Sequence, residues 1–199
     1  MTLAALALFA TIAATITIDH NPVPFRCAAD DAAAQATVTL IAGTPDKNGA
    51  ALSALTDGEL PTDSDQPSAN VFFQADTWGG RVRLDLGREI DIAAILTYSW
   101  HPSTRGPQLY KVYGSDGTHP AFDAAPSSKL DPECCGWSLI AFVDTRPEEG
   151  EGGGQYAVRI DGAGRHRYLL FDFFETESDD AWGNTFYSEI DVVSSATGQ

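Results

Sequence analysis

The sequence is poor in basic residues and in cysteine. Lysine and arginine together number 12, against 28 aspartate and glutamate residues, so the formal charge at pH 7 is -16. A surface of that sign repels the phosphate backbone of nucleic acids and anionic membrane surfaces, so neutral ligands or cations are the expected partners. The three cysteines, Cys27, Cys134 and Cys135, lack the spacing of a four-ligand zinc site. In an exported protein Cys27 could pair with one of the adjacent two, and the sequence does not choose which.

Motifs of several common enzyme classes are also missing. The sequence has no Gly-x-Ser-x-Gly elbow, no His-Glu-x-x-His pair and no phosphate-binding loop. Asp172 and Glu175 are carboxylates of the kind that glycosidases use as acid and base. Asp172, however, lies among the aromatic residues of a strand-like run, which favours a structural acid with satisfied hydrogen bonds. We therefore expect a protein that is not an enzyme.

The N-terminus carries the longest stretch without charge. Residues 1–18 contain no charged side chain, and residues 3–14 have the length of a signal-peptide core, which is too short to span a bilayer comfortably. No lysine or arginine precedes Arg26, so the usual positive start is reduced to the amino terminus. We expect a secreted or cell-surface protein, with membrane contact only through this segment if it is not cleaved. The alternative is a retained segment, because residues 15–18 alternate as a strand and an apolar tail can dock on another subunit.

Strand-like segments recur through the rest of the chain. Apolar and charged side chains alternate in residues 81–86, which is typical of a strand with one buried face. No helix is predicted, residues 28–36 resemble a linker, and the polar, proline-rich residues 118–136 indicate a surface loop. These patterns predict an all-β, antiparallel β-sandwich of about eight to nine strands over residues 36–199, preceded by an apolar signal or anchor segment and linker over residues 1–35. The predicted strands cover residues 37–42, 71–74, 81–86, 92–98, 109–114, 137–144, 155–160, 168–174 and 188–193.

A polar and aromatic loop lies between two of these strands. Within six residues, Trp100, His101 and Arg105 offer a flat apolar face, an imidazole and a forked donor. This combination suits a ligand made of hydroxyls and C–H faces, which means a sugar. The alternative is that Trp100 belongs to the core, His101 faces water and Arg105 pairs with a surface acid.

Four motifs occur in an order that carries a resemblance. They are Leu55-Thr56-Asp57-Gly58 with Thr62, residues 82–87, residues 110–117 with Trp137, and residues 186–192. With them the chain resembles the discoidin domain family, the coagulation-factor C-type or galactose-binding-like domains that include many carbohydrate-binding modules. The resemblance covers residues 37–195 and implies a jelly-roll sandwich of two antiparallel sheets, with binding loops at one end and no catalytic machinery of its own.

The resemblance also implies a structural calcium site. The family's typical ligands are an acid, a threonine five residues later and a glutamate in the last strand, which correspond here to Asp57, Thr62 and Glu189. Calcium takes about 6 to 8 oxygen ligands, and Gly58 permits the tight bend that wraps an ion, with Glu59 as a further ligand. The alternative is that residues 57–58 form an ordinary turn and Glu189 is a surface carboxylate.

The ligand site implied by the resemblance combines the polar loop with residues 180–186. Sugar-binding relatives have a histidine and an arginine in the first segment, and an asparagine with an aromatic residue in the second. Two features weigh against a sugar site in this chain. Gly79-Gly80-Arg81 replaces an aromatic residue that usually precedes the Asp-Leu-Gly strand. In addition, family members without sugar affinity often keep an arginine near position 105 for structural reasons. The expected ligand-binding residues are Trp100, His101, Arg105, Trp182, Asn184 and Phe186.

Together these observations predict a noncatalytic, exported carbohydrate-binding module with a structural calcium ion. Its expected ligand is a glycan or a glycoprotein carrying neutral, galactose-like sugars. The alternative is a structural or adhesive surface protein, active in cell adhesion, that assembles with copies of itself or with other subunits, or is anchored, through its apolar N-terminal segment.

Overall fold

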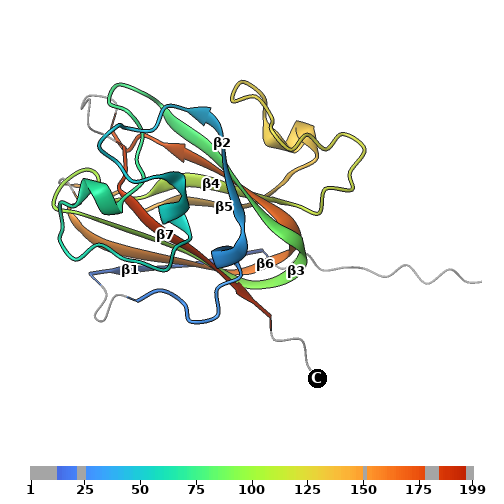
Figure 1. Ribbon diagram of the computed structural model, residues 1–199, viewed down its shortest axis with the longest axis horizontal. Coiled ribbons are helices and arrows are strands. Elements are labelled where there is room, and N and C mark those ends of the chain that lie inside the picture. The colour runs from blue at the N-terminus through green and yellow to red at the C-terminus, as the bar shows by residue number, and fades with distance from the viewer. Residues whose placement is uncertain (1–12, 22–25, 150–151, 178–183, 196–199) are drawn as a thin grey trace, which may run out of the picture.

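The computed structural model describes residues 13–21, 26–149, 152–177 and 184–195. These residues form antiparallel strands and short 3-10 helices, and none of their helices is long and apolar enough to cross a membrane (Figure 1). The strands are β1 (Thr15–His20), β2 (Thr37–Gly43), β3 (Gly79–His101), β4 (Leu109–Ser115), β5 (Ser138–Asp144), β6 (Gly154–Phe174) and β7 (Tyr187–Ser194). The 3-10 helices are η1 (Ala33–Gln35), η2 (Leu52–Leu55), η3 (Pro67–Ala69) and η4 (Pro132–Cys135).

Two long strands, β3 and β6, contribute to both layers of a sandwich. In the first layer, residues 79–85 of β3 pair with β2 on one side and with residues 168–174 of β6 on the other. This part of β6 pairs with β4, and β4 pairs with β5 at the edge. In the second layer, residues 92–101 of β3 pair with β7 and with residues 154–164 of β6, whose other edge holds β1. Every pairing is antiparallel, so the predicted antiparallel sandwich is confirmed.

Glycines mark the points where the long strands turn from one layer to the other. In β3 the register breaks between Asp85 and Ile90, around Gly87 with a φ of 77°. In β6 the bend holds Gly162 and Gly164, with φ of 75° and 89°. Residues with a Cβ atom rarely adopt a positive φ, so glycine allows the bend. The predicted strands 81–86 and 92–98 are therefore the two halves of β3, and 155–160 and 168–174 are the halves of β6.

Apolar side chains from both layers meet between them. Val82 and Leu84 of β3 are fully buried, as the alternation of residues 81–86 predicts. The predicted strand 71–74 forms only isolated bridges, Val71 with Tyr187 and Phe73 with Pro45. The core also includes Ile95, Tyr110, Val112, Val158, Ile160, Leu169, Phe171, Ile190 and Val192.

The insert of residues 118–136 covers the outer face of the first layer. Beneath it, Arg81 forms a bidentate ion pair with Asp172, at 2.5 and 2.7 Å. The same guanidinium donates to the carbonyl oxygens of Pro126 and Ser127 at 3.0 and 2.8 Å. The alternation of residues 81–86 assigns Arg81 to the polar face, but the insert buries that part of the face and makes its arginine a structural anchor.

The stretch predicted as a linker packs against β7. The backbone N–H of Ala28 donates to the Asp191 carboxylate, and that of Ala32 donates to the Val192 carbonyl at 2.8 Å. In Figure 1 this segment runs between β1 and β2, beside β7. The boundary between residues 35 and 36 stays a prediction.

The cysteines are free, so the disulfide considered for Cys27 is not formed. Cys27 is half-buried, Cys134 is exposed and Cys135 is buried in a small second cluster with Trp137.

Candidate functional site

The polar loop and residues 184–186, the described part of the second expected segment, lie side by side. After β3 ends at His101, the loop of residues 102–108 passes along residues 184–186, which lead into β7. The N–H of Phe186 donates to the carbonyl of Arg105 at 2.9 Å, and the hydroxyl of Thr185 donates to the carbonyl of Pro107 at 2.5 Å. We call the group of His101, Arg105, Phe186 and the neighbouring Phe72 the loop site.

Arg105 forms the centre of the loop site. Its guanidinium carbon lies 5.0 Å from the centre of the Phe72 ring and 4.8 Å from the centre of the Phe186 ring. The two rings also stack on each other, with centroids 4.2 Å apart. Only 7% of Arg105 is exposed. An arginine over aromatic faces is attracted by their quadrupoles, so Arg105 holds the loop against β7.

His101 is the least buried residue of the loop site, with 13% of its side chain exposed. Its ring lies edge-on to Phe186 at 4.8 Å, and its Nδ1 accepts a hydrogen bond from the Ser103 N–H at 3.1 Å. Burial lowers the pKa of His101 below the usual imidazole value; the charge of Arg105 acts in the same direction, whereas Asp65 opposes it. In the neutral ring Nε2 therefore carries the proton, and it lies 3.9 Å from Asp65, beyond hydrogen-bond distance. This N–H is suited to donate to a ligand hydroxyl.

The other expected ligand residues are arranged differently. Trp100 precedes His101 in β3, so their side chains leave opposite faces of the strand. Asn184 is buried and donates to the carbonyls of Gln74 at 3.3 Å and Thr77 at 3.2 Å, which fastens that turn. Trp182 lies outside the described residues.

Phe72 is the loop-site residue that the sequence interpretation missed. It lies in the predicted strand 71–74, where successive side chains alternate between faces. Phe73 packs into the core against Phe173, with ring centroids 6.2 Å apart, whereas Phe72 faces Arg105 and Phe186. That alternation is the signal that could have identified it.

A polar cleft of about 370 Å³ adjoins the same loop. Arg146 forms one side, donating to both oxygens of Asp144 at 2.9 and 2.6 Å. The volume is at the lower end of small-molecule sites, and carboxylate and hydroxyl groups at its wall suit hydroxylated ligands. The cleft is lined by Thr104, Pro107, Asp144, Arg146, Pro147, Thr176 and Glu177.

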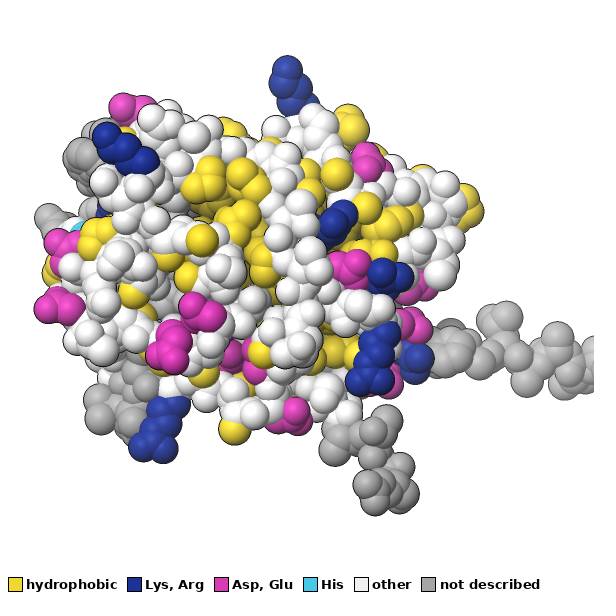
Figure 2. Space-filling model, viewed as in Figure 1, with side chains coloured by type: hydrophobic (Ala, Val, Ile, Leu, Met, Phe, Trp, Pro, Cys, Tyr) yellow, Lys and Arg dark blue, Asp and Glu magenta, His cyan; other side chains and the backbone are white. Residues whose placement is uncertain are grey.

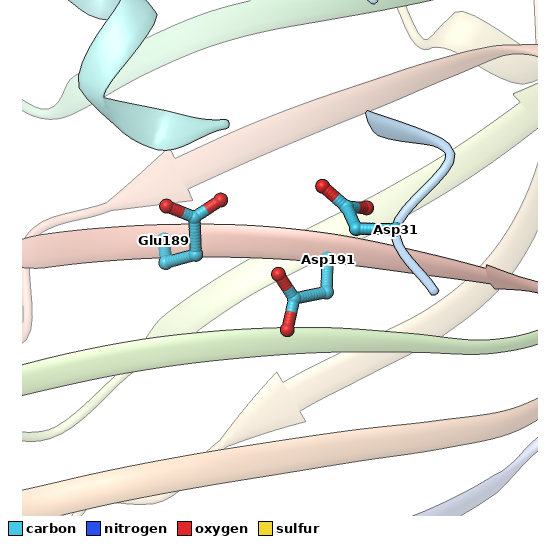
Figure 3. Close-up of side chains that lie close together, drawn as sticks. All are labelled: Asp31, Glu189 and Asp191. Atoms are coloured by element: carbon cyan, nitrogen blue, oxygen red, sulfur yellow. The ribbon is translucent and has the colours of Figure 1, made fainter. Parts of the chain in front are cut away.

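A second group of functional side chains lies at β7. One oxygen from each of Asp31, Glu189 and Asp191 lies within 4.8 Å of the others, and Glu189 and Asp191 are fully buried (Figure 3). We call these three residues the acidic cluster. Burial, together with the charge of Asp191, raises the pKa of Glu189 to about 9, and burial raises that of Asp191 to about 6. Carboxylates at this spacing can hold a metal ion.

Of the calcium ligands expected from the sequence, Glu189 contacts the Asp57 turn, but the other three side chains face solvent. Oε2 of Glu189 accepts a hydrogen bond from the Gly58 N–H at 3.0 Å, so this glutamate contacts the Asp57 turn. Asp57, Glu59 and Thr62 are exposed. The carboxylate of Asp57 accepts from the Glu59 N–H at 3.0 Å, and the Thr62 N–H donates to the Gln66 side chain at 2.9 Å. Asp191 has the same strand alternation as Glu189 and could have been found, whereas nothing in the sequence connects Asp31 to either.

The acidic cluster differs from the other acids of the protein. On the face drawn in Figure 2, carboxylate side chains are dispersed among basic, polar and apolar ones. Such dispersed acids are ordinarily solvated.

Comparison with known proteins identifies the fold. No family model matches the chain, and no curated protein matches its sequence. Among solved structures, the lectin domain of lectinolysin complexed with Lewis B antigen is 15% identical with a TM-score of 0.53, and the match covers 84% of this chain and 99% of that one. A fucose binding module of Streptococcus pneumoniae is 12% identical with a TM-score of 0.53 and coverages of 83% and 98%.

A third match is a Clostridium perfringens protein designated CpGH89CBM32-6. It is 20% identical with a TM-score of 0.50, and the match covers 83% of this chain and 99% of that chain. These likenesses show that the chain has the galactose-binding-like, discoidin-type β-sandwich fold, as the sequence motifs predict.

Proposed function

We propose that this chain is a noncatalytic carbohydrate-binding module. The observation that carries the proposal is the fold, which it shares with a fucose binding module and with a lectin domain complexed with Lewis B antigen. Here His101 offers a donor at one end of the loop of residues 102–108, and Thr104 and Pro107 of the same loop line a polar cleft of about 370 Å³. A sugar needs such a combination of directional polar contacts and adjoining surface.

The six expected ligand residues divide into two proposed roles. His101 contacts the sugar by donating its Nε2–H to a hydroxyl, and Trp100 and Trp182 offer aromatic faces for stacking. Arg105, Asn184 and Phe186 are buried, so their proposed role is to hold the two binding segments in place. This division keeps the six residues of the sequence prediction, with direct contact proposed for His101, Trp100 and Trp182.

The proposed ligand is a neutral, galactose- or fucose-like glycan, free or on a glycoprotein. The net charge of -16 disfavours sulfated or sialylated chains through long-range repulsion. An open cleft immobilises few groups and leaves water around the ligand, so the affinity of one site is modest.

The absence of catalysis is part of the proposal. Asp172, the strongest carboxylate candidate for acid or base chemistry, is buried in the ion pair with Arg81. Both of its oxygens accept hydrogen bonds from the guanidinium, so they are already engaged within the fold. Its arrangement supports a structural role.

A structural calcium ion is the proposed cofactor. The carboxylates of Asp31 and Asp191, which lie close to Glu189, are oxygen ligands and suit Ca²⁺ better than zinc, which prefers nitrogen and sulfur. Asp57, Glu59 and Thr62 stay proposed ligands with Glu189, which already contacts the turn through Gly58. When bound, the ion neutralises buried negative charge and ties the turn to the last strand.

A glycan array probed with the fluorescently tagged full chain tests carbohydrate binding. We expect signals on neutral galactosylated or fucosylated glycans that are lost in His101→Ala. The matched control is His119→Ala, because His119 is an exposed histidine in the insert between β4 and β5. An array without signal above background, at a protein concentration that detects weak lectins, would refute the proposal.

A second candidate function is adhesion through self-association, as expected for a secreted or cell-surface protein. One observation favours it: among the described strands β1 pairs only with β6, and all six of its residues are exposed. Open strand edges can pair with another chain. A size-exclusion mass above that of the monomer, reduced by Ile18→Lys in β1, would support this role; a monomer at all concentrations would exclude it.

A further inference from the structure

The acidic cluster lies where the N-terminal segment of residues 26–36 crosses β7. Asp31 comes from this segment, whereas Glu189 and Asp191 come from the strand (Figure 3). The segment is fastened there by backbone bonds: Ala32 N–H donates to the Val192 carbonyl, and Ala28 N–H donates to Asp191. The cluster therefore joins two parts of the chain about 160 residues apart in sequence, as the separation of 161 between Asp31 and Val192 shows.

Each carboxylate of the cluster uses one oxygen for hydrogen bonds. Oδ1 of Asp31 accepts from the N–H groups of Ala33 at 2.8 Å and Val192 at 2.7 Å. Oδ2 of Asp191 accepts from the hydroxyl of Tyr98 at 3.0 Å and from Ala28. Oε2 of Glu189 accepts from Gly58. These bonds fix the orientation of all three side chains.

The second oxygen of each carboxylate has no hydrogen-bond partner although it is buried. The three atoms are Oδ2 of Asp31, Oε1 of Glu189 and Oδ1 of Asp191. Among the described residues, no lysine, arginine or histidine forms an ion pair with these side chains. A buried, unpartnered carboxylate oxygen costs about 1 to 3 kcal/mol or more, and three together repel one another. A cation among them would remove both penalties.

The spacing of the cluster fits a calcium ion. With each Ca²⁺–O distance about 2.3–2.6 Å, two ligand oxygens on opposite sides of the ion are about 5 Å apart. One oxygen from each of the three side chains lies within 4.8 Å of the others, and Figure 3 shows one oxygen of each carboxylate turned toward the rest. Carboxylate oxygens favour Ca²⁺ over zinc, which prefers nitrogen and sulfur ligands.

We propose that Asp31, Glu189 and Asp191 bind a calcium ion that fastens the N-terminal segment of residues 26–36 to β7. This ligand set shares only Glu189 with the Asp57 turn. The inference rests on the calcium part of the proposed function but is independent of glycan binding. Without the ion the segment is held by hydrogen bonds, such as those of Asp31 with Val192 and of Ala28 with Asp191, and by the burial of Ala33 in the core, so calcium adds to how firmly it docks.

Terbium binding to the full-length protein tests this ligand set. Terbium replaces calcium at oxygen sites, and its emission is excited through nearby tyrosines such as Tyr98, whose hydroxyl lies 3.0 Å from the Asp191 carboxylate. We expect emission that calcium displaces, and an affinity reduced by about tenfold or more in Asp31→Asn. Asp116→Asn is the matched control, because Asp116 is an exposed acid just after β4, and it should keep the affinity within about twofold. Asparagine preserves the shape of Asp31 and an oxygen acceptor, so folding is preserved.

Two results would overturn the inference in distinguishable ways. Calcium-displaceable emission that is lost in Asp57→Asn but kept in Asp31→Asn would assign the ion to the turn and leave the proposed calcium intact. Absence of any displaceable emission from the wild-type protein would remove calcium altogether.

Hydrogen exchange then tests the fastening itself. In the wild-type protein, calcium should slow exchange of the Ala28 and Ala32 amides at least about tenfold, and Asp31→Asn should abolish this difference. Equal exchange rates with calcium and with EDTA in the wild type would contradict the fastening. In EDTA, Asp31→Asn should unfold at or above the wild-type temperature, because the variant has one buried charge fewer; a marked loss would show a folding defect and contradict the predicted charge relief.

Discussion

The guanidinium of Arg105 stacks on the ring of Phe186, with 4.8 Å between the guanidinium carbon and the ring centre. Phe72 contacts the guanidinium as well, at 5.0 Å. Because this arrangement joins the loop after β3 to the segment before β7, the shape of the loop site depends on it.

Replacing Arg105 should therefore lower both stability and glycan affinity. Arg105→Met keeps the apolar stem but removes the charge over two rings, so we expect a loss of about 2 kcal/mol in the free energy of unfolding in urea. Arg159→Met is the control, because Arg159 is half-exposed in a surface ion pair with Asp161. Its expected loss is below about 1 kcal/mol. Equal losses in the two variants would contradict the stacking role.

The two arginine–aspartate pairs of the first layer should differ in strength. Arg81 and Asp172 are 3% and 7% exposed as side chains, whereas Arg146 and Asp144 are 43% and 32% exposed. Asp172→Ala leaves the Arg81 charge buried and should cost about 3 to 5 kcal/mol in urea unfolding. Asp144→Ala should cost about 1 kcal/mol or less. A small loss in Asp172→Ala would show that the insert does not depend on this ion pair.

The lowered pKa of His101 predicts a specific pH dependence of stability. The neutral ring is favoured in the folded state, so its contribution is fully present above the unfolded pKa of about 6.5 and is lost as the pH falls through the lower folded pKa. His101→Gln should remove this part of the pH dependence. Unfolding free energies of both proteins between about pH 5 and pH 8 would measure it.

Other histidines do not obscure this comparison. His166 also has a lowered pKa, but it is present in both proteins and cancels in the difference. If the difference between wild type and His101→Gln were constant over the whole range, His101 would not be held neutral by the fold.

Calcium should stabilise the whole protein. At a concentration of 100 times the dissociation constant, binding adds about 2.7 kcal/mol, which corresponds to a rise of about 5 to 10 °C in melting temperature for a domain of this size. Differential scanning calorimetry should show the rise and its reversal by EDTA. Magnesium at the same concentration serves as the control; identical melting curves in calcium, magnesium and EDTA would exclude a structural calcium ion.

Much of the fold could be predicted from local patterns. The alternation of residues 81–86 correctly identified Val82 and Leu84 as core, because a strand with one buried face repeats every two residues. The same pattern could not place Arg81, since its burial depends on the insert of residues 118–136, which returns over β3 from a distant part of the chain. The sequence also predicted residues 81–86 and 92–98 as separate strands, although β3 continues past the bend at Gly87 and pairs on in the other layer.

The candidate sites were less accessible to sequence reasoning. His101 and Phe186 were identified because they lie in motifs of the fold, and the structure brings them together. The alternation of residues 71–74 could have identified Phe72, whereas Asp31 was missed because it meets its partners only through tertiary contacts. Asp31 lay in a stretch of alanine and aspartate that resembles a linker, and only its docking on β7 reveals the acidic cluster.

Titration of the ¹⁵N-labelled protein with fucose and galactose, followed by amide chemical shifts, tests the central claim most directly. Carbohydrate binding at the loop site predicts saturable shifts of the His101, Arg105 and Phe186 amides, with the insert of residues 118–136 unaffected, and loss of these shifts in His101→Ala. Spectra that do not change with either sugar or with an array-selected glycan, or saturable shifts confined to surfaces away from the loop site, would contradict it.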